Sequence, residues 1–247
     1  MPNVRLERTG PVATLVIDNA DVKNGLTPEM GYQIAQLCDE IDGDLSIGAA
    51  VIQGANGTFC SGADTRLWDP SVPQNSDEGY ERSNAVYGAF ARVGRLEVAT
   101  IAAVRGAAVG AGMNLMLATD LRVVSSTARL LSGFIKIGLH PGGGFFTIAN
   151  RTGGRETTAA MGLFSQEISG SRAAEIGLAW EAVPDTEVEE RALELATQAA
   201  ADPLLMRRAV KSFRTETGPP AMTWEAALEV ERGVQMWSQH RRQSKQQ

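Results

Sequence analysis

Two short segments near the start of the chain alternate apolar and polar residues. They cover 4–8 and 12–18 and enclose Gly10 and Pro11, so the pattern predicts a β-hairpin. Short apolar runs with turn residues around them are typical of buried strands. The chain has three later runs of this kind, at 49–54, 100–104 and 121–125.

Helical spacing of apolar residues separates these strands. From Pro28 to about residue 42, apolar residues recur every three or four positions, at Met30, Ile34, Leu37 and Ile41. This spacing predicts a helix with proline in its first turn. We expect two more helices in this part of the chain, over 77–95 and 113–118.

The last quarter of the chain has helical spacing alone. Three stretches show it, and Asp202-Pro203 and the Gly-Pro-Pro run at 218–220 break the pattern between them. The predicted helices cover 187–201, 203–215 and 222–240. Because strand–helix repeats come first and helices come last, we expect an α/β core over residues 1–186 and a helical region over 187–247.

Composition narrows the class of protein. Hydrophobic residues make up 43% and charged residues 21% of the chain, and the net charge is −6, which argues against a nucleic-acid or membrane surface. No apolar run is long enough to span a membrane and the start lacks a signal core, so we expect a cytoplasmic protein. The two cysteines, Cys38 and Cys60, form no CxxC pair and are interpreted as small buried apolar residues.

Several familiar sites do not fit the sequence. The third glycine of a dinucleotide-binding GxGxxG is missing after Gly112, and neither GxxxxGK[ST] nor GxSxG occurs. The chain has two histidines, His140 and His240, too few for a multi-histidine metal site. We therefore expect no metal and no tightly bound cofactor.

Two glycine- and alanine-rich segments each follow a predicted strand, at 58–64 and 105–114. Small residues let the backbone approach a ligand closely, and N–H groups in such turns can point into a cleft. Two such donors would suit the oxygen of a developing enolate. The alternative is that both segments are tight turns that allow close helix–strand packing.

Six segments resemble, in order, the motifs of the crotonase (enoyl-CoA hydratase/isomerase) superfamily. They match its "RPxxxNAL", "FxAGAD", "VxGxAxGGGxxL", "xCDxR", "GxxPGxGG" and "GLVxxVxP" motifs, at 21–26, 59–64, 104–115, 118–122, 138–144 and 177–184. The resemblance implies an α/β fold built as a spiral of ββα repeats. It also implies a C-terminal helical region that forms homotrimers, often paired into hexamers.

The resemblance also implies a ligand and the residues that bind it. In the family, the backbone N–H groups that match Ala63 and Ala111 form an oxyanion hole for an acyl-CoA thioester, and coenzyme A is part of the substrate. The segment from Ala63 to Asp64, Thr65 and Arg66 would line the coenzyme A site, with Arg66 near the nucleotide phosphates or simply solvated.

A further part of the coenzyme A site is implied earlier in the chain. Lys23 and Asn24 match the family segment whose backbone flanks the adenine.

Two positions depart from the family pattern. The hydratases of the family use two glutamates, and the matching positions here hold Asn114 and Phe134. An amide cannot take up a proton at neutral pH and a phenyl ring has none to give, so hydratase activity is in doubt. His140 is a possible substitute or merely a turn residue, and Glu78 and Glu81 are possible but better explained as a solvated helix face.

We therefore expect an enoyl-CoA hydratase/isomerase family protein of fatty acid metabolism that binds an acyl-CoA thioester and stabilises its enolate with backbone N–H groups. A non-catalytic acyl-CoA-binding protein is the first alternative. The second is an offshoot of the family that acts on a carbonyl compound without coenzyme A. The presence of the segment 63–66 argues against this second alternative.

Overall fold

The computed structural model describes residues 2–64 and 77–218. Its strands are β1 (Asn3–Thr9), β2 (Val12–Asp18), β3 (Ala49–Gly54), β4 (Ala99–Val104), β5 (Ala107–Val109), β6 (Leu121–Ser125), β7 (Arg129–Leu131), β8 (Ile168–Ser169) and β9 (Glu181–Val183). Its α-helices are α1 (Pro28–Gly43), α2 (Asp77–Val93), α3 (Ala111–Leu117), α4 (Phe145–Gly162), α5 (Gly170–Glu175), α6 (Val188–Ala199) and α7 (Pro203–Thr217). Short 3₁₀ helices cover Ala20–Val22, Ile135–Ile137 and Asp185–Glu187.

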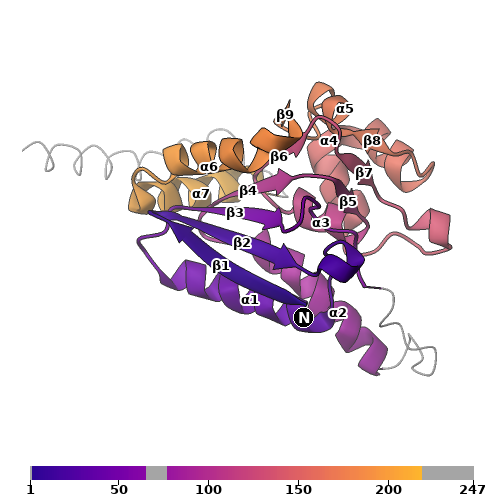
Figure 1. The fold of residues 1–247 in the computed structure, drawn as a ribbon, viewed down its shortest axis with the longest axis horizontal. Helices are drawn as coiled ribbons and strands as arrows, with labels where there is room; N and C mark the ends of the chain where they lie inside the picture. Colours follow the sequence, from indigo (N-terminus) through magenta and orange to yellow (C-terminus); the bar gives the residue numbers. More distant parts are fainter. Residues whose placement is uncertain (1, 65–76, 219–247) are drawn as a thin grey trace, which may run out of the picture.

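The main sheet has six strands in the order β1-β2-β3-β4-β6-β9 (Figure 1). Strand β1 pairs with β2 in antiparallel fashion, as the predicted hairpin requires, and the other neighbours are parallel. Strands of a parallel sheet need helical crossovers, which α1 and α2 supply between successive strands. The sequence order therefore places the loops after β3 and β4 at the same edge of the sheet.

Helices cover both faces of this sheet (Figure 1). On one face, α1 packs against α2 and the hairpin, and its apolar positions Met30, Ile34 and Ile41 are completely buried. On the other face, α6 lies along β3 and β4, and Val188 and Ala192 pack against the sheet. The predicted division of the chain at residue 186 stays a prediction, but α6, beyond that point, covers part of the core.

A second, three-stranded sheet has the order β5-β7-β8. Its strands are only two or three residues long, and β5 lies inside the glycine- and alanine-rich segment. A parallel bridge joins Cys60 to Ala108 in β5, with the Cys60 N–H donating to Ala107 O at 3.0 Å. This bridge brings the two glycine- and alanine-rich segments side by side.

Helix termini follow the sequence signals. The Thr27 hydroxyl accepts from the Met30 N–H at 3.2 Å, and Pro28 follows at the first helical position of α1. The Asp202 carboxylate caps α7 by accepting from the Leu205 N–H at 3.2 Å. The predicted helix over 222–240 lies outside the described residues. Within 2–64 and 77–218, no helix is long and apolar enough to cross a membrane.

Candidate active site

The segment Ser61–Asp64 is held in place by the loop before α1. The Ser61 N–H donates to Lys23 O at 3.0 Å, and the Asp64 N–H donates to Leu26 O at 2.8 Å. In return, the Leu26 N–H donates to the carbonyl oxygen of residue 62 at 2.8 Å. The last two bonds form a parallel bridge between Leu26 and Ala63 that uses the carbonyl of residue 62 and the N–H of residue 64, so the N–H of Ala63 between them points away from Leu26.

Asn24 fastens this loop to the segment that follows β3. Its side chain is completely buried and donates to Ala55 O at 2.8 Å and Thr58 O at 2.6 Å, while its amide oxygen accepts from the Asn19 N–H at 2.9 Å. These bonds occupy the carboxamide fully, so Asn24 can offer a ligand only its backbone. Lys23 is exposed and also has a left-handed backbone, with φ of 52°.

Ala63 and Ala111 come at the ends of the two neighbouring segments. The parallel bridge between Cys60 and Ala108 sets the register, and each alanine comes three residues later. A Cβ placed on Gly62 would lie 3.8 Å from the Ala111 nitrogen, which shows how close the segments remain. Within the part of the chain that the structure describes, neither alanine N–H has a hydrogen-bond acceptor.

The start of α3 depends on two glycines. Gly110 precedes the helix with φ of 54°, a conformation that L-residues rarely adopt. A Cβ on Gly112 would lie 2.3 Å from the Cys60 carbonyl oxygen, so only glycine allows the helix to approach this closely. The N–H of Ala111 is the first of α3, where the helix dipole favours negative charge.

Asn114 lies one turn into α3 and is 1% exposed. Its amide nitrogen donates to Gly142 O at 2.9 Å and to Gly143 O at 3.3 Å. Its amide oxygen is buried and has no partner within the described residues. Since helical side chains lean toward the N-terminus, the Asn114 carboxamide lies over the turn that begins at Ala111.

Two aromatic side chains of α2 pack against the turn formed by residues 142–144, which we call the glycine turn. A Cβ on Gly142 would lie 2.2 Å from the Tyr87 hydroxyl, and one on Gly143 would lie 2.5 Å from the Phe90 ring. The Tyr87 and Phe90 ring centroids are 5.6 Å apart. Tyr87 belongs to no motif that the sequence analysis identified. The packing of α2 on the turn formed by residues 142–144 places it at the candidate site.

Phe134 and His140 both precede this turn in the chain. Phe134 is half-buried against the core, with its ring centroid 6.1 Å from that of Phe145. His140 is exposed, its Nδ1 lies 2.7 Å from Pro141 O, and its ring meets the edge of Phe146. The first contact is that of a turn residue bonded to backbone, which is one of the two roles predicted for His140.

The structure describes only some of the other predicted site residues. Asp64 is buried and Glu81 is exposed on α2. Thr65, Arg66 and the side chain of Glu78 lie outside the described residues.

Both cysteines are buried, as predicted, and burial raises the pKa of each thiol to about 12. Cys60 lies beside the candidate site, but at neutral pH it stays protonated and does not supply a thiolate nucleophile.

A hollow of about 600 Å³ lies elsewhere, where α4 is kinked at Gly154. Arg155, Arg172 and Ile176 are among the residues that line it. None of the predicted site residues lines this hollow, so we place the candidate site at the two alanine N–H groups.

Comparisons with known proteins identify the family of the chain. The enoyl-CoA hydratase/isomerase family model matches residues 7–247. Probable enoyl-CoA hydratase EchA14 of Mycobacterium tuberculosis is 36% identical over 209 residues, 85% of this chain and 80% of that protein. The 1,2-epoxyphenylacetyl-CoA isomerase of Escherichia coli is 29% identical over 230 residues, 91% of this chain and 85% of that protein.

Solved structures extend the likeness to the fold. The enoyl-CoA hydratase from Polaromonas sp. JS666 matches with a TM-score of 0.87 at 23% identity, over 96% of this chain and 91% of that one. This match confirms the predicted crotonase-type α/β fold. Together with the family model, it confirms the resemblance seen in the sequence: the chain belongs to the enoyl-CoA hydratase/isomerase family of enzymes.

Proposed function

We propose that the protein binds an acyl-CoA thioester and holds the thioester oxygen between the N–H groups of Ala63 and Ala111. The observation that carries this proposal is a pair of N–H groups that have no acceptor among the described residues, at the ends of two segments that the Cys60–Ala108 bridge holds side by side. A thioester oxygen gains negative charge as an enolate forms, and two fixed donors stabilise that charge where water is excluded. The Ala111 N–H adds the positive end of α3.

The coenzyme A part of the ligand would lie along the 23–26 loop and the segment after Ala63. The exposed Lys23 ammonium and the backbone beside Asn24 are the described groups that support this placement. Asp64, Thr65 and Arg66 complete the proposed coenzyme A site. No cofactor beyond coenzyme A itself is needed for this role.

The acid–base chemistry of a hydratase is absent from its usual positions. Asn114 uses both amide hydrogens on the glycine turn, and Phe134 packs against Phe145. General acids and bases contribute about 10²–10⁴-fold each, so their loss leaves enolate stabilisation without a proton carrier at those two positions. The protein is thus either an enzyme for a different acyl-CoA reaction or a binding protein that does not turn its ligand over.

Calorimetry tests the ligand. Butyryl-CoA should bind and free butyrate should not, because the oxyanion donors and the coenzyme A site both act on the thioester. Equal binding of the two ligands, or binding of neither, would remove coenzyme A from the proposal and favour a carbonyl compound as substrate.

The oxyanion donors can be tested separately with Ala111→Pro. Proline fits the first position of a helix but lacks the N–H, so α3 keeps its start and loses one donor. Acetoacetyl-CoA readily forms an enolate, and its affinity should fall roughly 10- to 150-fold, as for a hydrogen bond to a charged group worth about 1.5–3 kcal/mol. Unchanged affinity in a folded variant would exclude the Ala111 N–H from the site.

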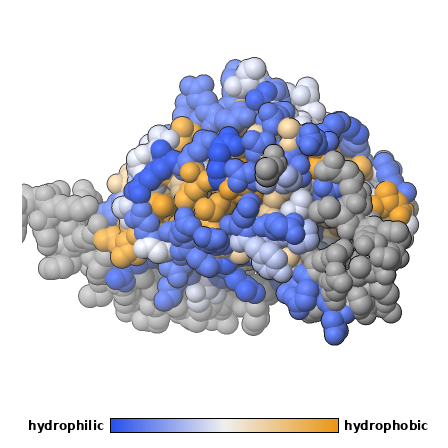
Figure 2. Space-filling model, turned by 60° about the horizontal axis from the view of Figure 1, so that its bottom comes forward, coloured by the Kyte–Doolittle hydropathy of each residue, from blue (hydrophilic) through white to orange (hydrophobic). Residues whose placement is uncertain are grey.

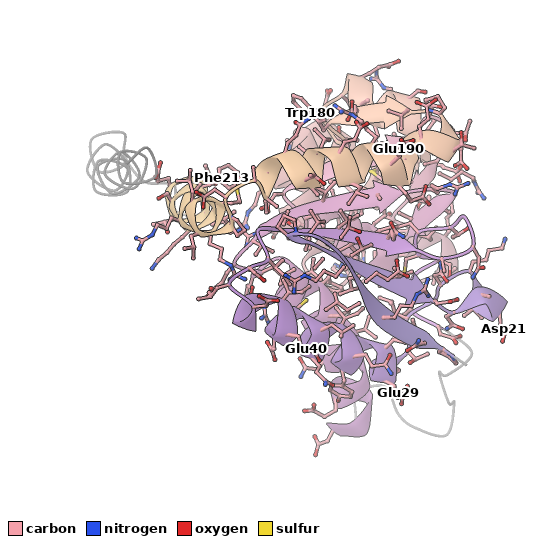
Figure 3. The ribbon with its side chains drawn as sticks, turned by 60° about the vertical axis from the view of Figure 1, so that its left-hand side comes forward. Asp21, Glu29, Glu40, Trp180, Glu190 and Phe213 are labelled. Atoms are coloured by element: carbon pink, nitrogen blue, oxygen red, sulfur yellow. The ribbon has the colours of Figure 1, made fainter. Side chains whose placement is uncertain are left out.

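We also propose a trimer, alone or paired into a hexamer. Among the described residues, several large apolar side chains remain exposed, including Phe164 at 71%, Trp180 at 63% and Phe213 at 54%. Figure 2 shows apolar surface gathered in the middle of one face with polar residues around it. In Figure 3, Phe213 lies on α7 and Trp180 lies at the edge of the molecule beyond α6.

A further inference from the structure

Each of the two proposed oxyanion donors shares a peptide group with a carbonyl. The N–H of Ala63 belongs to the same peptide as the carbonyl of Gly62, and the N–H of Ala111 belongs to the same peptide as the carbonyl of Gly110. A trans peptide is planar, so its N–H and C=O point in opposite directions. Whatever holds one of these carbonyls therefore also sets the direction of the N–H that a ligand meets.

Helix α3 holds the Gly110 carbonyl by itself. This carbonyl accepts from the Met113 N–H at 3.0 Å and from the Asn114 N–H at 3.2 Å. Both bonds belong to the first turn of α3, and the second is the regular bond of an α-helix. The direction of the Ala111 N–H thus follows from helix geometry.

The Gly62 carbonyl lies in a bend, and two separate groups bond it. The Leu26 N–H donates to it at 2.8 Å, and the Cys60 thiol donates to it with the sulfur 3.7 Å from the oxygen. The same sulfur accepts from the Gly62 N–H at 3.5 Å. The thiol therefore bonds the two peptide groups on either side of Gly62.

The bend at Gly62 needs this support. Its φ is 111°, a conformation that favours glycine, and the residue is buried. Among the described residues, the Cys60 sulfur is the one acceptor for the Gly62 N–H. A buried N–H without an acceptor is unfavourable, so the thiol stabilises the bend that precedes Ala63.

Cys60 is itself held by the other glycine- and alanine-rich segment. Its N–H donates to Ala107 O at 3.0 Å, and its carbonyl accepts from the Val109 N–H at 3.0 Å. The side chain is completely buried, and burial raises the pKa of the thiol to about 12, so the sulfur keeps its hydrogen at neutral pH. A hydrogen bond to a carbonyl also polarises the peptide, which makes the N–H of that peptide a better donor.

We propose that Cys60 is a positioning residue whose thiol holds the peptide between Gly62 and Ala63, so that the Ala63 N–H points at the oxygen of the enolate. The inference rests on the proposed function. Cys60 acts on the ligand through this peptide group and does not touch the thioester. Its effect is larger on an enolate than on a neutral thioester, because a charged oxygen gains more from an aligned donor.

The readout is the pH at which bound acetoacetyl-CoA becomes an enolate by losing the proton between its two carbonyls to the solvent. The enolate absorbs in the near ultraviolet, so a pH titration at saturating protein gives the midpoint. In Cys60→Ala, the ratio of enolate to keto form should fall about 2- to 12-fold, the effect of one neutral hydrogen bond. The midpoint should therefore rise by about 0.3–1.1 pH units.

Two further variants separate positioning from simple packing. Cys60→Ser is the rescue variant, because a hydroxyl donates and accepts as the thiol does, and its midpoint should lie close to that of the unmodified protein. Cys38→Ala is the matched control, because Cys38 is also a completely buried thiol but lies on α1. It leaves a similar small cavity in the core and should not move the midpoint.

The outcomes distinguish this inference from the proposed function. An unchanged midpoint in Cys60→Ala overturns the positioning role and leaves acyl-CoA binding in place. An equal rise of the midpoint in Cys60→Ser or in Cys38→Ala overturns it as well. If the unmodified protein binds no thioester, or if bound acetoacetyl-CoA ionises at the same pH as in water, the proposed function fails and this inference fails with it.

Discussion

At the scale of single residues, Asn114 is more than a glutamate that has lost its charge. The carbonyls of Gly142 and Gly143 point at its amide nitrogen, and both need a donor. An ionised glutamate is only an acceptor, so it would face two carbonyl oxygens and repel them. The glycine turn and the asparagine therefore fit each other, and the site is built for an amide.

This fit predicts slow hydration of crotonyl-CoA. The unmodified protein lacks a proton carrier at 114 and 134, and the Asn114→Glu variant should not gain one because the glycine turn rejects a carboxylate. Phe134→Glu would bury a charge beside Phe145, which raises the pKa of the new carboxyl group. Loss of enoyl absorbance measures the rate.

Rapid hydration by the unmodified protein would contradict this and show that another group carries the proton. His140→Ala is then the first variant to make, because the His140 ring is exposed beside the turn. Retained activity in that variant would shift attention to Glu81 and Glu78.

At the scale of elements, Arg207 joins α7 to the end of α1. The Arg207 side chain is 8% exposed and donates to four backbone carbonyls, those of Ile41, Asp42, Asp44 and Ile47. The last carbonyls of a helix have no partner within it, and a cation there also suits the helix dipole. Arg207 therefore caps α1 from a distant part of the chain.

Arg207→Met should destabilise the protein by about 3 kcal/mol or more, because it leaves buried carbonyls without donors. Urea unfolding followed by circular dichroism at one protein concentration measures the change. Lys211→Met is the control, since Lys211 is exposed on the same helix and its loss should cost under about 0.5 kcal/mol. Equal stability of the two variants would contradict the capping role.

An ion pair ties β4 to the start of α6. Arg105 follows β4 and donates to Asp185 at 2.9 Å and to Glu189 at 3.2 Å. The hydrogen bond from Arg105 holds the pKa of the Asp185 carboxyl below its usual value. Both partners remain partly exposed, so the pair contributes under about 1 kcal/mol.

The sign of this shift predicts how Asp185→Asn behaves with pH. A lowered pKa in the folded state means that the stabilisation is present above the unfolded pKa of about 3.9 and disappears as pH falls through the folded value. The variant should be slightly less stable than the unmodified protein at pH 7, and the difference should vanish in acid. Urea unfolding of both proteins at pH 7 and in acid measures the difference in their free energy of unfolding. A difference that grows in acid would contradict the prediction.

How well an element could be predicted depended on its length and on whether its contacts are local. The hairpin and α1 were predicted because alternation and helical spacing extend over whole segments. Strand β5 was missed because Ala107–Val109 is three residues long and gains its strand partners from β7 and Cys60. The bounds of the 18-residue helix α4 were not predicted, because glycines interrupt the helical spacing of its apolar residues.

The candidate site divides in the same way. Motifs identified the segments of the two alanines and of the glycine turn, which the structure brings together, because each motif is continuous in sequence. Tyr87 and the bonds of Asn114 depend on contacts between α2, α3 and the 142–144 turn, which no local pattern encodes.

At the scale of the whole molecule, the described surface keeps large apolar side chains that one chain does not bury. The family resemblance implies subunit contacts for the helical region after position 187. The apolar residues described in that region are of two kinds. Val210 is buried within the chain and Leu193 packs against the sheet, whereas Leu204 and Phe213 stay exposed. Leu163, Phe164 and Trp180, outside that region, are exposed as well. We propose that part of this apolar surface forms the contacts between subunits.

We therefore predict a light-scattering mass of three or six times the chain mass of 26.3 kDa at micromolar concentration. Phe213→Glu should lower this mass or make it fall on dilution, because a charge in an apolar contact loses hydration without gaining a partner. Lys211→Glu is the control, since two residues along a helix point to nearly opposite faces, and it should keep the mass. A mass of one chain for the unmodified protein would contradict the assembly. An unchanged mass in Phe213→Glu would keep the assembly and move the contact away from α7, toward Phe164 and Trp180.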